Sequence, residues 1–405
     1  MLTILHPTLA LMKRVEEKVK DIVEVRSFAK VSDFAADPAQ TLASYHFTDI
    51  TASLMTKWLD SIVNVRSDRG VAVALAGFRG VGKSHFMATL AAIASQTELR
   101  NQISDQYVAA SAERLSRRHN PVAFVRRGSQ ATLLEELQMA IAPITGDGDL
   151  SNSLHDLLLK AAEATRDFPL VLLIDTALGR ESRVSRDDGP ILSEIAEAAK
   201  ALGIFVGLAL DDDIAGADGA NLAITGSYTI DYLDQEHLYK IVDSHIFSKQ
   251  DRSLPLLHDI YKHYVAVLPG FRWSEQRFTS LYPLHPATLE IAPLIRLYLQ
   301  DFALLGFAAE AGVKILGRPA NSLIGLDEVF DAVENRLRHV SDLDDAFTAF
   351  DRADHDIIGK SPVTQRLQAK LILKGLFMLS LDGQGTTADE IAASMLIFND
   401  DGQTG

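Results

Sequence analysis

Hydrophobic residues near the start of the chain recur at helical spacing. Within residues 9–26 the apolar side chains fall on one stripe of a helix, which predicts a helix there. A polar stretch at 31–48 follows, and the pattern of residues 49–64 predicts a second helix. We therefore expect an N-terminal helical lead-in over residues 1–48.

From residue 71 the pattern changes to short, charge-free apolar runs separated by segments of helical length. The runs are Val71–Ala76, Val122–Val125, Leu170–Ile174, Ile204–Leu210 and Leu222–Thr225. Continuous apolar runs of this length are typical of strands in a parallel sheet that is covered on both faces. The sequence thus predicts an α/β domain with a parallel sheet over residues 49–233.

After residue 234 the strand signal fades and the pattern is helical to the end of the chain. Residues 363–381 form an apolar helical segment, and Thr386–Glu390 has the composition of a helix N-cap. A helix, a short turn and a capped helix are typical of the start of a winged-helix module, although a plain helical hairpin fits the same pattern. The turn-like end at 397–405 predicts that the chain is an N-terminal fragment or the product of a truncated gene.

A glycine-rich loop follows the first apolar run. Its residues match the pattern G-x-x-x-x-G-K-[ST] and are Gly77, Phe78, Arg79, Gly80, Val81, Gly82, Lys83 and Ser84, with His85 next in the helical segment. A strand before the loop and a helix after it are the context that phosphate binding requires, because backbone N–H groups and the helix N-terminus then face the phosphates. Lys83 is expected to reach the β- and γ-phosphates and Ser84 to ligate Mg²⁺. A glycine-rich turn before a helix is the alternative.

An acidic residue ends the run at 170–174. A phosphate-binding loop of this class works with a carboxylate at the end of a neighbouring strand, which holds the Mg²⁺ shell, and Asp175 is in that position. Hydrolysing relatives usually carry Glu directly after this Asp, whereas Thr176 stands here. Glu181 and Asp187, with Asp188, are the candidates for the base that activates water. A solvated polar loop is the alternative for each of them.

Further polar residues lie in the loop after Asp175 and at the ends of later runs. Arg180, Arg183 and Arg186 either pair with neighbouring acids or include an arginine finger that reaches the γ-phosphate of a neighbouring subunit. Asp211 follows one apolar run and Thr225 ends another, so either is a candidate γ-phosphate sensor, and the strand order decides which run neighbours the loop. Turn chemistry is the alternative for both.

The loop, Asp175, the further strands and the helical remainder together resemble the AAA+ branch of P-loop ATPases. In that family a helical lid follows the sheet and closes over the nucleotide. The resemblance therefore implies a lid domain at 234–350. A further helical region follows at 351–405, which the winged-helix interpretation makes an incomplete winged helix. An arginine on a lid helix senses the γ-phosphate in the family. The resemblance implies Arg318 for that role, with Arg272 second, and structural salt bridging is the alternative for either.

Short strings narrow the resemblance. Gly77–Phe86, Tyr282–Pro286 and the segment around Arg318 are similar to the P-loop ATPases of bacterial phage-defence islands, the BREX-type ATPases BrxC and PglY. The resemblance implies a defence complex in which the chain associates with itself or with other defence-system proteins. Those relatives are usually longer than this chain.

Composition and charge limit the remaining classes. The chain has 405 residues, a net charge of −15 and no cysteine, which excludes disulfides, thiolate metal sites and thiol catalysis. No apolar run approaches the ~18–20 residues that span a bilayer, and no signal peptide precedes the first helix, so we expect a cytoplasmic protein without membrane contact. The region 351–405 has five basic and eight acidic residues. We therefore expect DNA contact only indirectly or through a missing C-terminal part.

The acidic surplus is unevenly distributed. Residues 51–130 carry 11 Lys and Arg against five Asp and Glu. This basic segment includes the glycine-rich loop, where a polyanionic nucleotide is expected to dock.

Three functions follow from these patterns. The first is an ATP- and Mg²⁺-binding ATPase that works as a switch or motor. The second is a nucleotide-binding scaffold that hydrolyses ATP weakly or not at all, because Thr176 replaces the usual Glu. The third is a small-molecule kinase, which the long helical remainder disfavours because kinase lids are usually shorter insertions within the α/β core.

Overall fold

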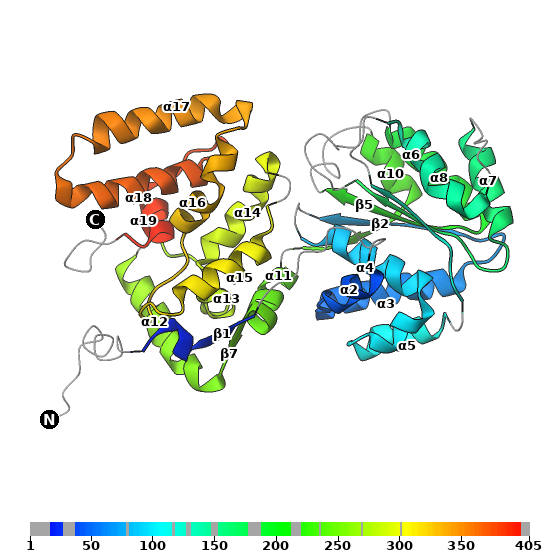
Figure 1. Cartoon of the computed structure of the whole chain (residues 1–405), viewed down its shortest axis with the longest axis horizontal. Helices are drawn as coiled ribbons and strands as arrows, with labels where there is room; N and C mark the ends of the chain where they lie inside the picture. Colours follow the sequence, from blue (N-terminus) through cyan, green and yellow to red (C-terminus); the bar gives the residue numbers. More distant parts are fainter. Residues whose placement is uncertain are drawn as a thin grey trace. The chain divides into compact units, whose positions relative to one another are not determined.

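A computed structural model describes most of the chain, which divides into two compact units. The described residues are 17–26, 37–77, 81–115, 118–126, 131–146, 153–176, 188–211, 220–234, 236–268, 270–299 and 302–397. One unit, the α/β unit, spans Ala29–His237, and the other, the helical unit, combines Met1–Phe28 with Leu238–Gly405. Figure 1 shows the elements of each unit coloured along the sequence.

The α/β unit is built on a five-stranded sheet in which all strands run parallel. The order is β3-β4-β5-β2-β6. The strands are β2 (Val71–Gly77), β3 (Val122–Arg126), β4 (Val171–Asp175), β5 (Phe205–Asp211) and β6 (Thr229–Tyr232). This architecture confirms the predicted α/β fold with a parallel sheet.

Helices cover both faces of the sheet, as Figure 1 shows. Side chains alternate along each strand, so Val73 and Leu75 of β2 pack in one core while Ala72 and Ala74 pack in the other. The helices on the first face are α2 (Pro38–Ala43), α3 (Asp49–Asn64), α4 (Lys83–Ser95) and α5 (Gln106–Glu113). Those on the second are α6 (Leu133–Thr145), α7 (Leu154–Ala164), α8 (Asp188–Leu202) and α10 (Ala220–Ser227).

Trp58 of α3 anchors the first face. Its ring is fully buried and lies edge-on to the rings of Phe86 and Phe205, at centroid distances of 5.3 and 5.9 Å. The indole Nε1–H donates to Asp231 of β6 at 2.8 Å. Gly207 on β5 makes room for this ring, because a Cβ at that position would lie 2.8 Å from it.

The helical unit has one continuous hydrophobic core. It contains a small antiparallel ladder of β1 (Val23–Val25) and β7 (Phe247–Lys249), with a 3₁₀ turn at Val19–Asp21 before β1. Its helices are α11 (Glu236–Ile241), which begins in the α/β unit, then α12 (Leu254–Val267), α13 (Glu275–Leu281), α14 (Pro286–Tyr298), α15 (Leu304–Ile315), α16 (Leu326–Leu337), α17 (Asp344–Ala353), α18 (Val363–Leu379) and α19 (Ala388–Met395). In the described part of the chain, no helix combines the length and apolarity needed to traverse a bilayer.

Three sequence predictions about elements were wrong. The pattern after residue 234 predicts helices only, whereas strand β7 lies there and pairs with β1. The helix expected over 9–26 is, in its described part, a 3₁₀ turn followed by strand β1. Val19, Ile22 and Val23 are buried and do follow helical spacing, but β1 gains ladder hydrogen bonds with β7, and tertiary pairing overrides local spacing. The run at 222–225 lies on helix α10 instead of a strand, because short apolar runs fit a buried helix and a buried strand equally well.

The last helices agree with the sequence. Helix α18 covers most of the predicted apolar segment, and Thr387 caps α19 in a capping box with Glu390. His285 joins this region to α14. Its Nδ1 accepts from the N–H of Ala287 at 3.1 Å, which caps α14, and its Nε2 lies 3.1 Å from the carbonyl oxygen of Ala393 on α19.

Candidate phosphate-binding site

The glycine-rich loop connects β2 to α4, in the strand–loop–helix order that phosphate binding requires. Strand β2 ends at Gly77, and Gly82 precedes α4 with a φ of 101°, a left-handed conformation that favours glycine. A Cβ on Gly77 would lie 2.1 Å from the carbonyl oxygen of Leu233, so a side chain does not fit there. Phe78, Arg79 and Gly80 lie outside the described residues.

Lys83, the first residue of α4, is turned into this loop. Its side chain is buried, with a relative exposure of 2% for the residue, and its Nζ donates to the carbonyl oxygen of Gly77 at 2.5 Å. A buried ammonium group needs polar partners to offset its lost hydration. The loop therefore holds the lysine head group between the end of β2 and the start of α4. Ser84 follows it and is partly exposed.

Asp175 lies at the same edge of the sheet. It ends β4 and is fully buried. Strand β5 separates β4 from β2, and its register places Ala209 beside Asp175 and Asp211 beside Gly77. Because the strands are parallel, the loop and this carboxylate share the carboxyl edge, where open α/β sheets bind ligands.

The donor set of Ser84 and Asp175 fits Mg²⁺. A hydroxyl and a carboxylate are hard oxygen donors, and Mg²⁺ is usually held by one or two protein groups together with phosphate oxygens and water. Among the described residues, no three His, Asp or Glu side chains form a metal cage of their own. A magnesium ion here would therefore share its coordination with a bound nucleotide.

Thr176 is buried and hydrogen-bonded to the sheet. It has a relative exposure of 2%, and both its hydroxyl and its N–H donate to the carbonyl oxygen of Ala209 on β5. The predicted bases Glu181 and Asp187 lie outside the described residues, as do Arg180, Arg183 and Arg186. Asp188 is described, and it is buried in the first turn of α8.

The strand order distinguishes the two residues considered as γ-phosphate sensors. Strand β5 is a direct neighbour of β2 and ends at Asp211, whose backbone pairs with Gly77. Thr225 lies on α10, so its predicted place at a strand end was wrong. Asp211 alone of the two therefore occupies the strand end beside the loop.

Two histidines pack against the site, the half-buried His85 and the buried His237. Nε2 of His85 is 3.3 Å from the carbonyl oxygen of Thr41, and its ring lies edge-on to Tyr45. His237 hydrogen-bonds the backbone of Val81 within the loop, while its Nδ1 is 2.7 Å from the carbonyl oxygen of Asp234. Burial lowers the pKa of both rings, so both are neutral at pH 7.

The sequence patterns do not predict a role for His237. The residue belongs to no motif, and the only signal is its position five residues after the end of β6, the other neighbour of β2. The strand order is needed to see that the segment after β6 returns to the loop.

We expect His237→Ala to weaken ATP binding about tenfold, because one hydrogen bond that fixes the loop backbone is lost. Titration with a fluorescent ATP analogue measures the change. His155→Ala, an exposed histidine on α7, is the matched control and should leave the affinity unchanged. Equal affinities in both variants would show that His237 does not position the loop.

The two candidate sensor arginines lie in the helical unit and form ion pairs there. Nη1 of Arg318 is 2.6 Å from Glu328, and Arg272 contacts Glu290 and Glu390 at 3.1 and 2.7 Å. Salt bridging, the alternative for both, is thus present, and the sensing role stays a prediction. Arg318 lies in the segment that connects α15 to α16, not on a helix.

The parallel sheet, the loop between β2 and α4 and the carboxylate at the end of β4 define an α/β fold of the P-loop NTPase class. No family model and no curated protein sequence matches the chain.

Solved structures similar to the chain share little sequence with it. One is Cdc6p from Pyrobaculum aerophilum, with 15% identity, coverage of 93% of this chain and 86% of that chain, and a TM-score of 0.37. Another is the Aeropyrum pernix Orc1 protein in complex with DNA, with 15% identity, 85% and 75% coverage and a TM-score of 0.34. A third is AMPPCP-bound DnaA from Aquifex aeolicus, with 12% identity, 88% and 87% coverage and a TM-score of 0.32. At these scores the similarity assigns no function.

Proposed function

We propose that the chain binds ATP with Mg²⁺ at the loop of residues 77–84 and works as an AAA+-type ATPase, a switch or motor. The observation that carries the proposal is the burial of Lys83 beside a loop that requires glycine at positions 77 and 82, at the sheet edge shared with Asp175. A purely structural turn has no need to bury an ammonium group.

Each residue of the site has a distinct task in this proposal. The backbone N–H groups at the start of α4 and the Lys83 ammonium bind the phosphates, helped by the helix dipole. Ser84 and Asp175 would hold Mg²⁺, which supplies charge neutralisation at the β- and γ-phosphates. We assign the activation of water to Glu181 or Asp187, the acids that follow Asp175 in the sequence.

Lys83→Ala tests the proposal. Loss of a charge-assisted contact to the phosphates should reduce the affinity for a fluorescent ATP analogue by at least about tenfold and abolish release of phosphate. Lys200→Ala on α8 is the matched control, because Lys200 pairs with Glu197 on the helix surface at 2.8 Å. Unchanged binding in Lys83→Ala would overturn the assignment of the loop.

A nucleotide-binding scaffold is the second candidate function. It is favoured by Thr176, whose hydroxyl is committed to the Ala209 carbonyl at the position where a hydrolysing enzyme usually has Glu. Tight ATP binding with no phosphate release over hours would support the scaffold. Turnover that Lys83→Ala abolishes would support the ATPase, and phosphate transfer to an added small molecule would favour a kinase.

We further propose a cytoplasmic role in a phage-defence complex, from the short strings shared with BREX-type ATPases. In this role the chain associates with itself or with other defence-system proteins, and Arg318 senses the γ-phosphate of ATP. Sedimentation with and without a slowly hydrolysed ATP analogue tests self-association. Phage plating on cells that carry the chain with its neighbouring genes, wild type against Lys83→Ala, tests the defence role.

A further inference from the structure

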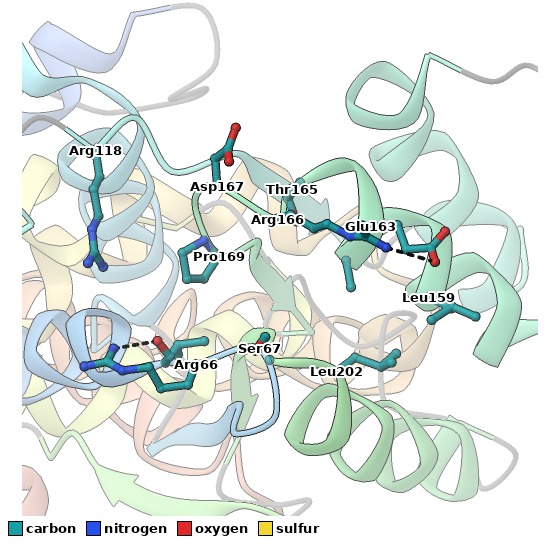
Figure 2. Close-up of a pocket in the computed structure, with 13 residues that line it drawn as sticks. Arg66, Ser67, Arg118, Leu159, Glu163, Thr165, Arg166, Asp167, Pro169 and Leu202 are labelled. Atoms are coloured by element: carbon teal, nitrogen blue, oxygen red, sulfur yellow. Dashed lines mark hydrogen bonds and ion pairs between the residues drawn. The ribbon is translucent and has the colours of Figure 1, made fainter.

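A second pocket lies at the amino edge of the same sheet. Its cavity volume is about 610 Å³, within the range of small-molecule sites. The lining comes from α7 and from segments just before β2, β3, β4 and β5, namely Val65–Ser67, Arg118, Thr165–Asp167 with Pro169, and Leu202–Gly203 (Figure 2). Strand β2 has seven residues, so this edge is about 20 Å from the glycine-rich loop. The pocket is therefore separate from the proposed ATP site.

Arginines dominate the polar part of the lining. Arg66, Arg118 and Arg166 contribute guanidinium groups, against the carboxylates of Glu163 and Asp167. Figure 2 shows Arg66 and Arg118 on one side of the pocket and the Arg166–Glu163 ion pair, 3.5 Å long, on the other.

Arg118 is the feature that most needs an explanation. Its side chain is partly buried, and within the described part of the chain no carboxylate pairs with it. Arg66 differs, because its Nη1 donates to the carbonyl oxygens of Val63 and Val65 at the end of α3. That leaves its Nε and Nη2 for a ligand and holds the guanidinium in one orientation.

The backbone that carries these arginines is firmly held. The buried Arg100 donates through Nη2 to the carbonyl oxygens of Arg118 and Ala94, which fixes the Arg118 backbone. Gly203 packs so closely on Arg66 that a Cβ would lie 2.2 Å from the Arg66 carbonyl oxygen, and its φ is 67°. Rigid walls reduce the entropy lost when a ligand binds.

We propose that this pocket binds a small phosphate monoester whose phosphate lies between Arg66 and Arg118. Two guanidinium groups match a dianionic phosphate in charge, and their planar N–H pairs match its oxygens in geometry. Apolar side chains complete the lining, and Figure 2 shows Leu159 and Leu202 on the side away from the two arginines. They provide a surface for the apolar body of the ester.

The location of the basic residues supports this site. The basic segment 51–130 was expected to serve the glycine-rich loop, but Arg66 and Arg118 from it line the pocket at the opposite edge. Their guanidinium groups therefore lie at the edge of the sheet away from the proposed ATP site.

Phenyl phosphate is a suitable probe, because it combines a phosphate monoester with an apolar ring. We expect saturable binding to the full chain by calorimetry, and Arg118→Gln should weaken it about tenfold or more. Leu159→Glu, which adds a negative charge to the wall, should weaken it as well. Absence of saturable binding to the wild type, or equal binding to Arg118→Gln, would overturn the proposal.

Matched controls separate this site from others. Arg114→Gln removes a nearby arginine that pairs with Asp60 at 2.8 Å and lies outside the pocket, and it should leave binding unchanged. Lys83→Ala should also leave it unchanged, and a loss there would place the probe at the glycine-rich loop instead. Inorganic phosphate should bind more weakly than phenyl phosphate, and equal affinity would contradict the role of the apolar wall.

Discussion

Gly77→Ala is expected to abolish ATP binding and to destabilise the α/β unit. The new Cβ would meet the carbonyl oxygen of Leu233 at 2.1 Å, and this backbone atom belongs to the segment that follows β6. Either the loop or that segment must shift. Overpacking of this kind lowers the free energy of unfolding by about 1–3 kcal/mol or more. A displaced loop loses several charge-assisted contacts to phosphate, so the ATP affinity should fall at least about 100-fold.

Gly226→Ala is the matched control for this substitution. Gly226 lies on helix α10, and a Cβ there has no neighbour within 4 Å. Alanine has a higher helix propensity than glycine, so the free energy of unfolding of this variant should be about 0.5–1 kcal/mol higher than that of the wild type. The variant should bind ATP normally. Fluorescent-analogue titration and urea unfolding measure both quantities. Normal ATP affinity in Gly77→Ala would mean that the loop tolerates a side chain at the end of β2.

His285→Ala is expected to destabilise the helical unit by about 3–5 kcal/mol. The imidazole is fully buried, packs edge-on to Trp273 at 4.8 Å, and makes hydrogen bonds with the backbones of α14 and α19. Its removal creates a cavity, removes the cap of α14 and leaves the Ala393 carbonyl oxygen without this partner.

The same residue predicts a pH dependence. Burial lowers the pKa of His285 to about 3, against 6.5 for an ordinary histidine, so the folded state holds it neutral. As the pH falls below 6.5, the unfolded chain binds a proton that the folded chain does not. Stability is therefore lost progressively between pH 6.5 and about pH 3, by up to ~1.4 kcal/mol per pH unit from this group. His285→Ala should remove this contribution.

The two tryptophans make the measurement specific to one unit. Trp58 lies in the α/β unit and Trp273 in the helical unit, and the chain has no others. In a Trp58→Phe background, urea unfolding followed by Trp273 fluorescence reports the helical unit alone. His355→Ala, an exposed histidine, is the control and should change stability by less than about 0.5 kcal/mol. An unshifted midpoint in His285→Ala would contradict the structural role of this residue.

The sequence predicted four of the five strands of the sheet and the glycine-rich loop between β2 and α4, because both depend on local patterns. Charge-free runs bounded by loops identify strands buried on both faces, as for Val71–Ala76 and Leu170–Ile174. The glycines of the loop are required by its own backbone and by the close approach of Leu233. Strand, loop and helix are contiguous in the chain, so a local sequence motif is enough to predict all three.

Features that depend on distant pairing escaped prediction. Strand β1 forms because β7 lies beside it, and its own residues fit a helical stripe. His237 contacts the loop because β6, the strand before it, lies beside β2 in the sheet. The sequence alone does not predict this strand order. Arg66 and Arg118 belong to the same basic segment as Lys83. They lie at the opposite edge of the sheet from Lys83, because they come before strands β2 and β3 whereas Lys83 follows β2.

The ladder of β1 and β7 has a consequence for synthesis on the ribosome. Val23 pairs with Lys249, and the α/β unit, which is continuous in sequence, is translated between them. At a translation rate of ~5–20 residues per second, β1 stays unpaired for on the order of tens of seconds until β7 is synthesised, and the α/β unit can fold in that time. During that interval a strand with two valines is open to wrong pairing. Its three-residue length and the outward charge of Glu24 keep it a poor template for aggregation.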